Sequence, residues 1–525
     1  LRRGLGGSHS LSLAPPVCVC VSHPLSLSFC ASFSACVCAM WSSPRSAVRL
    51  FSTATKTSVN ANFDSYFFAA ANRMPATGGM LDVVRMPDSV TRMSFPINGD
   101  QGSMKVIQAY RVIHSNHHRP VKGGLKFDKV MAWEDIGALA AMNSIRFSLA
   151  DIPWGGAKGG IAIDISQFSE KEQKRILRTY AHQLITHSSM SPSSGLISPD
   201  YGCDTNHLGI LLGSYRYHNP RDVNPLAVVL GKTVDQGGVS GITGTFGLGF
   251  GYGIQECVRR ATEMDPQLAD SLGKNFTWNG RTATIQGFGY VGSEVAGYIS
   301  EEKGAVTTII EKNVAIHNPA GLNVEDVRKY FAKTGNLEGY PNARTMEVNK
   351  GLHMPCDVFI PAAKENSINA NNVHMLQCKI LGECAVLPTT ARADGVLADR
   401  GVFVVPDLCT TVAADLIHYV EWLKGLTHIR YGRMERRFEM NTKSLILDTI
   451  EEVAGKNVNP LLRSLAGAGM TEQELVRTMV QDGVHRISVD VSKRASADNT
   501  SFRIAATTIG LEKILRVYQN NGIFP

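Results

Sequence analysis

The chain has few of the features that mark disulfide-rich, zinc-binding or membrane proteins. Of its 11 cysteines, five fall in the first 40 residues and the other six are scattered without a CxxC motif. This pattern fits reduced thiols in a cell interior better than a disulfide framework or a zinc site. We therefore expect no structural metal. No segment approaches the roughly 18–20 continuous apolar residues that a membrane span requires, so we expect no membrane contact.

Strong charge is also missing. The 525 residues carry a formal net charge of +7, and lysine and arginine are spread along the chain rather than massed in one run. A nucleic-acid partner is therefore not expected. With 44% hydrophobic and 19% charged residues, the composition is typical of a globular protein. The length predicts two principal domains with appendages.

The N-terminal segment has an unusual composition. Residues 17–38 could be interpreted as the apolar region of a signal peptide, but His23, Pro24 and repeated serines interrupt them. We expect residues 1–39 to be an untranslated or disordered leader before Met40. Residues 40–56 contain three basic residues, several hydroxyl residues and no acid. That composition is typical of a mitochondrial transit peptide and predicts a location in the mitochondrial matrix.

Hydrophobic periodicity predicts several elements. Apolar and polar residues alternate over 103–114, which predicts a strand, whereas helical spacing predicts helices over 129–150 and 171–188. The last stretch, 501–520, is also predicted to be a helix. Between the first two helices we expect a glycine-rich loop at 154–161, where a ligand and the backbone can approach closely.

A nucleotide-binding pattern occupies residues 282–313, which are predicted to form a strand, a glycine turn, a helix and a second strand. Gly287, Gly289 and Gly292 supply GxGxxG, and Glu311 follows at the end of the second strand. The glycines permit a tight turn and a close approach of the pyrophosphate, while the acid accepts hydrogen bonds from the ribose. GxGxxG alone is a weak signal, but its flanking elements and the acid make this one strong.

Three segments before this pattern place charged residues among glycines or prolines: 119–127 (RPVKGGLKF), 154–161 (WGGAKGGI) and 196–202 (LISPDYG). One lysine beside paired glycines is most simply a solvated loop charge. Two such lysines and an acid, all ahead of a dinucleotide-binding pattern, indicate a cleft that binds an anion and moves protons.

The order of these motifs is similar to that of the glutamate dehydrogenase family. KGGLKF is followed by PWGGAKGG, PDYG, GGVSG, QGFGYVG, IPAA, PTTARAD and VVPDL. The resemblance runs from about Met80 to the C-terminus and is strongest to the hexameric animal-type enzymes. It implies an α/β fold with an N-terminal α/β substrate and oligomerisation domain (57–230) and a Rossmann-like, doubly wound nucleotide-binding domain (231–430). An antenna-like helical insertion (431–488) and a C-terminal helix (489–525) would follow.

The resemblance also implies an activity, namely reversible NAD-dependent oxidative deamination of L-glutamate to 2-oxoglutarate and ammonium by a homohexamer. In that activity Lys158 would be the catalytic lysine, and Asp200 would exchange protons with the amino group. Lys122 would bind a substrate carboxylate, and Arg146 would keep the charge of a lysine that the family usually has there. A lysine flanked by other cations and partly dehydrated has a lowered pKa and can act as a base near neutrality.

The resemblance assigns cofactor binding to the glycine turn. Gly287, Gly289 and Gly292 are expected to hold the pyrophosphate, and the intervening Phe288, Tyr290 and Val291 are also expected to be cofactor-binding residues. Glu311 would receive the ribose hydroxyls and favour NAD by repelling a 2′-phosphate. Lys312 follows it, so NADP stays open as a second cofactor.

Several positions depart from the family pattern. Asp415 and His418 stand where the family has valine and serine in the pocket for the substrate's side-chain carboxylate, and Phe246 replaces a threonine that meets the nicotinamide. An aspartate there would repel that carboxylate unless it points away or pairs with His418. Two alternatives therefore stand beside glutamate oxidation. One is an amino-acid dehydrogenase with an altered substrate, and the other is a catalytically impaired paralogue that acts as a structural or regulatory mitochondrial subunit.

Overall fold

The computed structural model describes residues 58–75, 78–428, 434–460, 463 and 471–522. The predicted leader (1–39) and transit peptide (40–56) lie outside these residues. None of the helices in the described ranges combines the length and the apolar character needed to cross a membrane.

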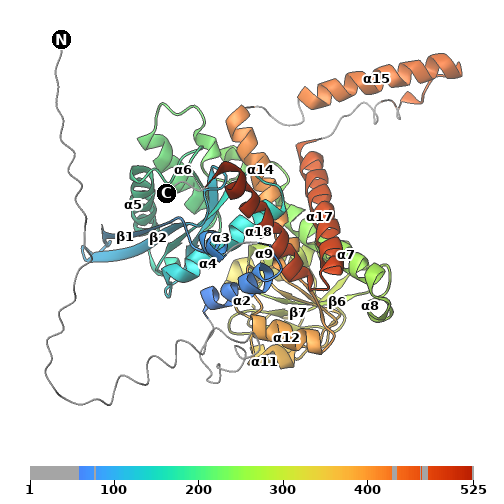
Figure 1. Cartoon of the computed structure of the whole chain (residues 1–525), viewed down its shortest axis with the longest axis horizontal. Coiled ribbons are helices and arrows are strands. Elements are labelled where there is room, and N and C mark those ends of the chain that lie inside the picture. Colours follow the sequence, from blue (N-terminus) through green and yellow to red (C-terminus); the bar gives the residue numbers. More distant parts are fainter. Residues whose placement is uncertain (1–57, 76–77, 429–433, 461–462, 464–470, 523–525) are drawn as a thin grey trace, which may run out of the picture. The chain divides into compact units, whose positions relative to one another are not determined.

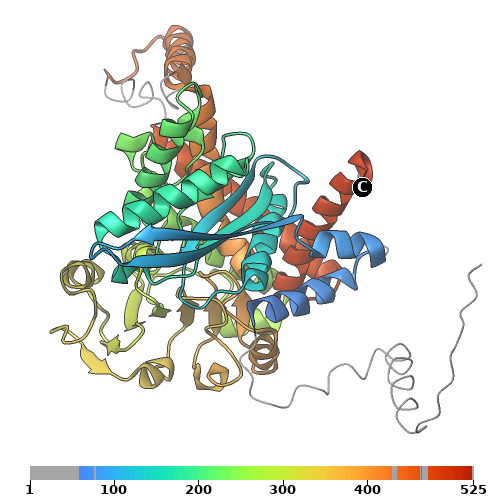
Figure 2. The ribbon, with the colours of Figure 1, turned by 90° about the vertical axis from the view of Figure 1, so that its left-hand side faces the viewer.

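The first half of the described chain is built on a five-stranded sheet in the order β1-β2-β4-β3-β5 (Figures 1 and 2). β2 is antiparallel to β1 and β4, whereas β3 is parallel to β4 and β5. The strands are β1 (Ser89–Asn98), β2 (Met104–Ile113), β3 (Val121–Phe127), β4 (Gly155–Ile161) and β5 (Gly195–Ser198). The helices are α2 (Val59–Ala71), α3 (Gly78–Arg85), α4 (Trp133–Leu149), α5 (Glu170–Thr186) and α6 (Thr205–His218).

Helices cover both faces of this sheet because the strands alternate their side chains between the faces. On β2, Ile107 and Ala109 join a core with α5 and α6, whereas Val112 contacts Ile136 and Ala140 of α4 on the other face. The predicted strand over 103–114 and the predicted helices over 129–150 and 171–188 are therefore confirmed, although α4 begins four residues later than expected.

The glycine-rich segment 154–161 is not the loop that the sequence predicts. Residues Gly155–Ile161 form the buried strand β4. A Cβ on Gly156 would lie 2.2 Å from the Ser144 hydroxyl oxygen, and a Cβ on Gly123 of β3 would lie 1.8 Å from the Ala157 carbonyl oxygen. The glycines are thus required for close packing of a strand, a use that composition cannot distinguish from a turn.

The second half contains a seven-stranded sheet in the order β12-β11-β10-β6-β7-β8-β9, which is parallel from β12 to β7. Its strands are β6 (Thr282–Gln286), β7 (Ala305–Ile310), β8 (Ala315–His317), β9 (Arg344–Met346), β10 (Val358–Pro361), β11 (Ile380–Gly382) and β12 (Phe403–Val405). Its helices are α7 (Ile242–Met264), α8 (Pro266–Leu272), α9 (Tyr290–Glu301), α10 (Val324–Thr334), α11 (Val348–Leu352) and α12 (Ala391–Asp399).

The predicted strand, turn, helix and strand over 282–313 are confirmed as β6, α9 and β7. From β6 the chain moves outward to β7 and later returns to β10 on the opposite side of β6. The carboxyl ends of β6 and β10 therefore flank the point where the strand order reverses. In open α/β sheets this point is the usual place for a bound nucleotide.

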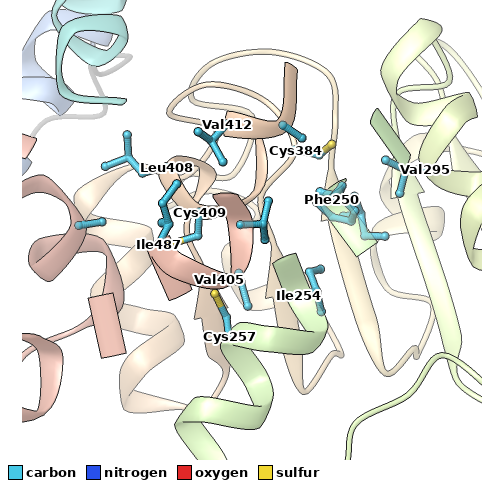
Figure 3. Packing of buried hydrophobic residues seen from close by; sticks show 14 of the residues in the cluster. Phe250, Ile254, Cys257, Val295, Cys384, Val405, Leu408, Cys409, Val412 and Ile487 are labelled. Atoms are coloured by element: carbon cyan, nitrogen blue, oxygen red, sulfur yellow. The ribbon is translucent and has the colours of Figure 1, made fainter. Parts of the chain in front are cut away.

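The remaining helices are α13 (Asp407–Thr410), α14 (Val412–Thr427), α15 (Met434–Ala454), α17 (Glu472–Ala497) and α18 (Phe502–Asn521). Figure 3 shows Ile254 of α7 and Ile487 of α17 in one apolar cluster with Val405, Leu408 and Cys409. α18, which confirms the helix expected over 501–520, packs on α4 and α2. The expected boundary at residue 488 falls inside α17, which runs through it without a break.

Arg503 fastens α18 to the second sheet. Its guanidinium donates to both carboxylate oxygens of Glu383, at 2.7 and 2.8 Å, and to Asp394 at 3.2 Å. The cation also lies over the ring of Tyr66 of α2, 4.7 Å from its centroid. Because Arg503 and Glu383 are both buried, neither charge can be released to water when its partner is lost.

Replacing this arginine should therefore destabilise the fold. Arg503→Met leaves Glu383 buried without its partner and is expected to lower the free energy of unfolding by about 3–5 kcal/mol, measured by denaturant titration. The matched control is Arg486→Met, which breaks a half-exposed pair with Asp151 at 3.6 Å. That change should cost less than about 1 kcal/mol. Equal effects of the two changes would contradict this account.

Candidate functional site

The three charged motifs of the N-terminal half converge at the centre of the first sheet. Lys122 lies on β3, Lys158 lies on the adjacent β4, and Asp200 follows β5 on the other side of β3. The Nζ atom of Lys158 donates a hydrogen bond to Oδ2 of Asp200. Both lysines are buried. The sequence-predicted acid–base residues are thus in direct contact.

A glycine makes this contact sterically feasible. A Cβ on Gly124 of β3 would lie 2.6 Å from Oδ2 of Asp200. Any larger residue would therefore push the carboxylate away from Lys158. Burial alone raises the pKa of the Asp200 carboxyl, but the charge and hydrogen bond of Lys158 outweigh it and hold that pKa below its ordinary value. Asp200 is accordingly ionised near neutral pH.

A second cluster lies beside this pair. Asp415 on α14 is buried and accepts from the Nζ of Lys122 through Oδ1, at 2.5 Å, and from the Nε of Arg146 through Oδ2, also at 2.5 Å. Burial raises the pKa of Asp415, yet Arg146 and Lys122 together lower it to about 2. For Lys122, burial lowers the pKa and Asp415 only partly opposes that change. Asp415 therefore neither points away nor pairs with His418, the two arrangements considered from sequence.

His418 lies about one turn further along α14 and is also buried. Neither ring nitrogen has a hydrogen-bond partner among the described residues. Burial, followed by the charge of Lys122, holds the pKa of His418 well below its ordinary value, so the ring is neutral. A Cβ on Gly231 would lie 3.1 Å from Nε2, and the ring of Phe246 lies 6.5 Å away between centroids.

Two pairs of residues that the sequence did not single out connect the two sheets. Lys126 at the end of β3 donates to Glu365 after β10, at 2.7 Å, and Lys364 donates to Asp128 at 3.0 Å. The Nζ of Lys364 also lies 4.1 Å from the ring centroid of Tyr201, the neighbour of Asp200. Of these four side chains, only Lys126 belongs to a motif that the sequence analysis named, as the second lysine of KGGLKF. These contacts place Asp200 at the junction of the two sheets.

Sequence reasoning also missed a buried ion pair between Lys232 and Glu421. Lys232 donates to Oε1 of Glu421, at 2.5 Å, and the backbone N–H of Gly231 donates to Oε2 of the same carboxylate at 2.6 Å. Both side chains are fully buried. Glu421 lies on α14, outside every motif that the sequence analysis used.

The glycine turn after β6 has the geometry of a dinucleotide cradle. Gly287 has φ of +94°, and a Cβ on Gly292 would lie 2.0 Å from the Gly287 carbonyl oxygen. Gly289 caps the N-terminus of α9, and a Cβ there would meet nothing within 4 Å. Open space at a helix N-terminus, where backbone N–H groups are free of helical partners, suits a phosphate. The turn therefore fits the pyrophosphate of a dinucleotide.

The other predicted cofactor residues differ in their surroundings. Oε1 of Glu311 accepts from the backbone N–H of Phe288, and Oε2 accepts from that of Lys312 at 3.2 Å. The side chain of Phe288 is buried, and Val291 packs against the core, so both support the turn from below. Tyr290 is 55% exposed, and its ring meets Phe246 edge to face at 5.6 Å. Phe246 thus lies between the turn and His418.

Known proteins are similar to this chain over most of its length. A family model described as the Glu/Leu/Phe/Val dehydrogenase dimerisation domain matches residues 87–217, and one described as glutamate/leucine/phenylalanine/valine dehydrogenase matches residues 237–468. The chain is 33% identical over 466 residues to the mitochondrial glutamate dehydrogenase of Dictyostelium discoideum, which covers 88% of this chain and 91% of that relative. The chain belongs to the Glu/Leu/Phe/Val dehydrogenase family.

More distant members of the family agree. The glutamate dehydrogenase of Thermotoga maritima is 29% identical over 364 residues, which cover 69% of this chain and 83% of that protein. Among solved structures, the leucine-bound hetero-hexameric glutamate dehydrogenase of Thermus thermophilus matches with a TM-score of 0.72 at 23% identity, over 90% of this chain and all of that one. That likeness confirms the predicted two-domain α/β fold. Family membership in turn makes this chain an oxidoreductase that acts on amino acids with NAD or NADP.

The lowered pKa of Asp415 predicts a pH dependence of stability. Because its folded pKa of about 2 lies below the ordinary 3.8, ionised Asp415 stabilises the fold above about pH 4, and this contribution is lost as the pH falls toward 2. The difference in free energy of unfolding between wild type and Asp415→Asn should therefore shrink by about 1 kcal/mol between about pH 6 and about pH 3. Denaturant titrations at each pH measure it. The exposed Asp490, changed to Asn, should show no such trend; a constant difference for Asp415→Asn would refute the pairing.

Proposed function

We propose that this protein catalyses the reversible, NAD(P)-dependent oxidative deamination of L-glutamate to 2-oxoglutarate and ammonium. The observation that carries the proposal is the contact between the buried Lys158 and the partly buried Asp200. This pair lies beside Lys122, on the strand next to that of Lys158, and near the second sheet. The relatives named glutamate dehydrogenase support the choice of substrate.

In this proposal the chain's own residues position the substrate and move a proton. Lys122 and Arg146 supply positive charge for substrate carboxylates. The Nζ of Lys158 donates a hydrogen bond to Oδ2 of Asp200, so the pair can hold a proton and pass it to and from the substrate's amino group. When bound at the glycine turn, the dinucleotide supplies the hydride acceptor.

The domain roles follow from the same placement. We assign substrate binding and oligomerisation to residues 57–230 and dinucleotide binding to residues 231–430. The expected boundary at residue 488 is not kept, because α17 runs through it and packs in the core. We assign the antenna-like insertion to the chain between α14 and α17, and α17 and α18 to the C-terminal part of the fold. The position of Lys122, Lys158 and Asp200 on the first sheet, and of the glycine turn on the second, supports the first two assignments.

We further propose NAD as the preferred cofactor, a homohexamer as the working assembly and the mitochondrial matrix as the location. Glu311 supports NAD, because its carboxylate lies against the turn where it would repel a 2′-phosphate. The glutamate dehydrogenase of Thermus thermophilus, which is a hetero-hexamer with a similar fold, supports an assembly of six subunits. The relative of Dictyostelium discoideum, which is named as mitochondrial, supports the location.

The activity is tested by NAD(P)H oxidation with 2-oxoglutarate and ammonium, using the purified chain. Lys158→Ala should reduce turnover by roughly 10²–10⁴-fold, because it removes the group that holds the proton. Lys174→Ala, at an exposed position on α5, is the control and should leave the rate unchanged. Folded protein without turnover would contradict the proposed activity, and turnover that survives Lys158→Ala would contradict the assigned role.

Cofactor preference is tested at Glu311. Glu311→Ser removes the negative charge that would face a 2′-phosphate, so the ratio of kcat/KM for NADP to that for NAD should rise roughly tenfold or more. Glu325→Ser, at an exposed glutamate on α10, serves as the control for a general change of charge. An unchanged ratio would show that Glu311 does not contact the ribose.

A further inference from the structure

Every cation at the site already has a carboxylate partner from the chain itself. Lys158 pairs with Asp200, Lys232 pairs with Glu421, and Lys122 and Arg146 share Asp415. Four cations thus face three carboxylates, and the neutral His418 adds no charge. The cluster therefore offers one unbalanced positive charge to a ligand.

Asp415 already uses both of its carboxylate oxygens on these two cations. One of its oxygens lies 2.5 Å from the Nζ of Lys122, and the other lies 2.5 Å from the Nε of Arg146. Arg146 also donates to Asn143 at 2.8 Å, so its remaining donors are partly committed. A carboxylate that enters this cluster must displace Asp415 or be placed against its negative charge.

His418 indicates that a polar group of a ligand belongs beside this cluster. Its ring is buried and neutral, and neither nitrogen has a partner among the described residues. A neutral imidazole offers one donor and one acceptor. Buried polar groups are nearly always hydrogen-bonded, so this unused capacity is most simply satisfied by a bound substrate.

We propose that Asp415 determines substrate specificity by taking the place at Lys122 and Arg146 that a second substrate carboxylate would occupy. It thereby weakens the use of dicarboxylate amino acids and 2-oxo acids relative to monocarboxylate ones of the same length. The cluster has one positive charge in excess, which a single carboxylate neutralises. A dicarboxylate would leave one negative charge without a cation. The inference rests on the proposed function, since it concerns the relative use of substrates in that same reaction.

The kinetic test compares 2-oxoglutarate with 2-oxopentanoate, which has the same chain length and one carboxylate fewer. Both are assayed with ammonium and NADH in wild type, in Asp415→Asn and in Asp415→Val/His418→Ser, which carries the residues of the family pattern. The ratio of kcat/KM for 2-oxoglutarate to that for 2-oxopentanoate should rise roughly tenfold or more in both variants. A ratio that stays constant or falls overturns the proposal.

A binding test keeps this inference separate from the activity. The thermal midpoint is measured with glutarate and with pentanoate at equal ionic strength, which requires no turnover. Glutarate should raise the midpoint of Asp415→Asn more than pentanoate does, because it supplies the missing carboxylate, whereas wild type should respond no more to glutarate than to pentanoate. An equal response in the variant overturns the proposal, and absence of turnover in every protein counts only against the proposed function.

Asp394→Asn is the matched control. It removes a carboxylate from a different buried cation, Arg503, and should respond to glutarate and pentanoate as wild type does. If Asp415→Asn does not fold, the double variant decides the question by the same two measurements, because it leaves an uncharged side chain at each position as the family pattern does.

Discussion

Close contact between two glycine-rich strands is the constraint on which this site depends. Gly123 and Gly124 on β3 leave space for the backbone of β4 and for the Asp200 carboxylate. With side chains at these positions, Lys122 and Lys158 could not lie on adjacent buried strands with Asp200 in contact. Backbone proximity replaces side-chain packing here, which allows charged groups to be held rigidly inside the protein.

The buried cations of the site are tolerated because each is paired with a carboxylate at short range. An isolated buried ion is costly, and a partner with good hydrogen-bond geometry offsets much of that cost. Lys232 with Glu421 and Lys122 with Asp415 meet this condition. The pairing has a consequence for function, because a cation that is satisfied internally is less available to a substrate.

The C-terminal helices link the two sheets. α14 carries Asp415 and His418 to the cations of the first sheet, while α17 packs against α7 beside the second. α18 contacts α4 and, through Arg503, reaches Glu383 at the end of β11. Residues at the end of the described chain therefore position groups from its beginning.

The sequence by itself determined the local elements and the motif residues. Hydrophobic periodicity and the glycine spacing were enough for β2, α5, α18 and the strand–turn–helix that contains Gly287, because each depends on neighbouring residues. The same glycine signal was misleading at β4, since a turn and a close strand contact both require a missing side chain.

Only the tertiary structure decided which charges meet. Asp415 and Lys122 are 293 residues apart, and Asp415 and Arg146 are 269 apart, so no local pattern could reveal that the three form one cluster. The sequence identified Asp415 as unusual but left its partner open. The partner depends on where the fold places α14 relative to β3 and α4, which is a property of the packed chain rather than of any segment.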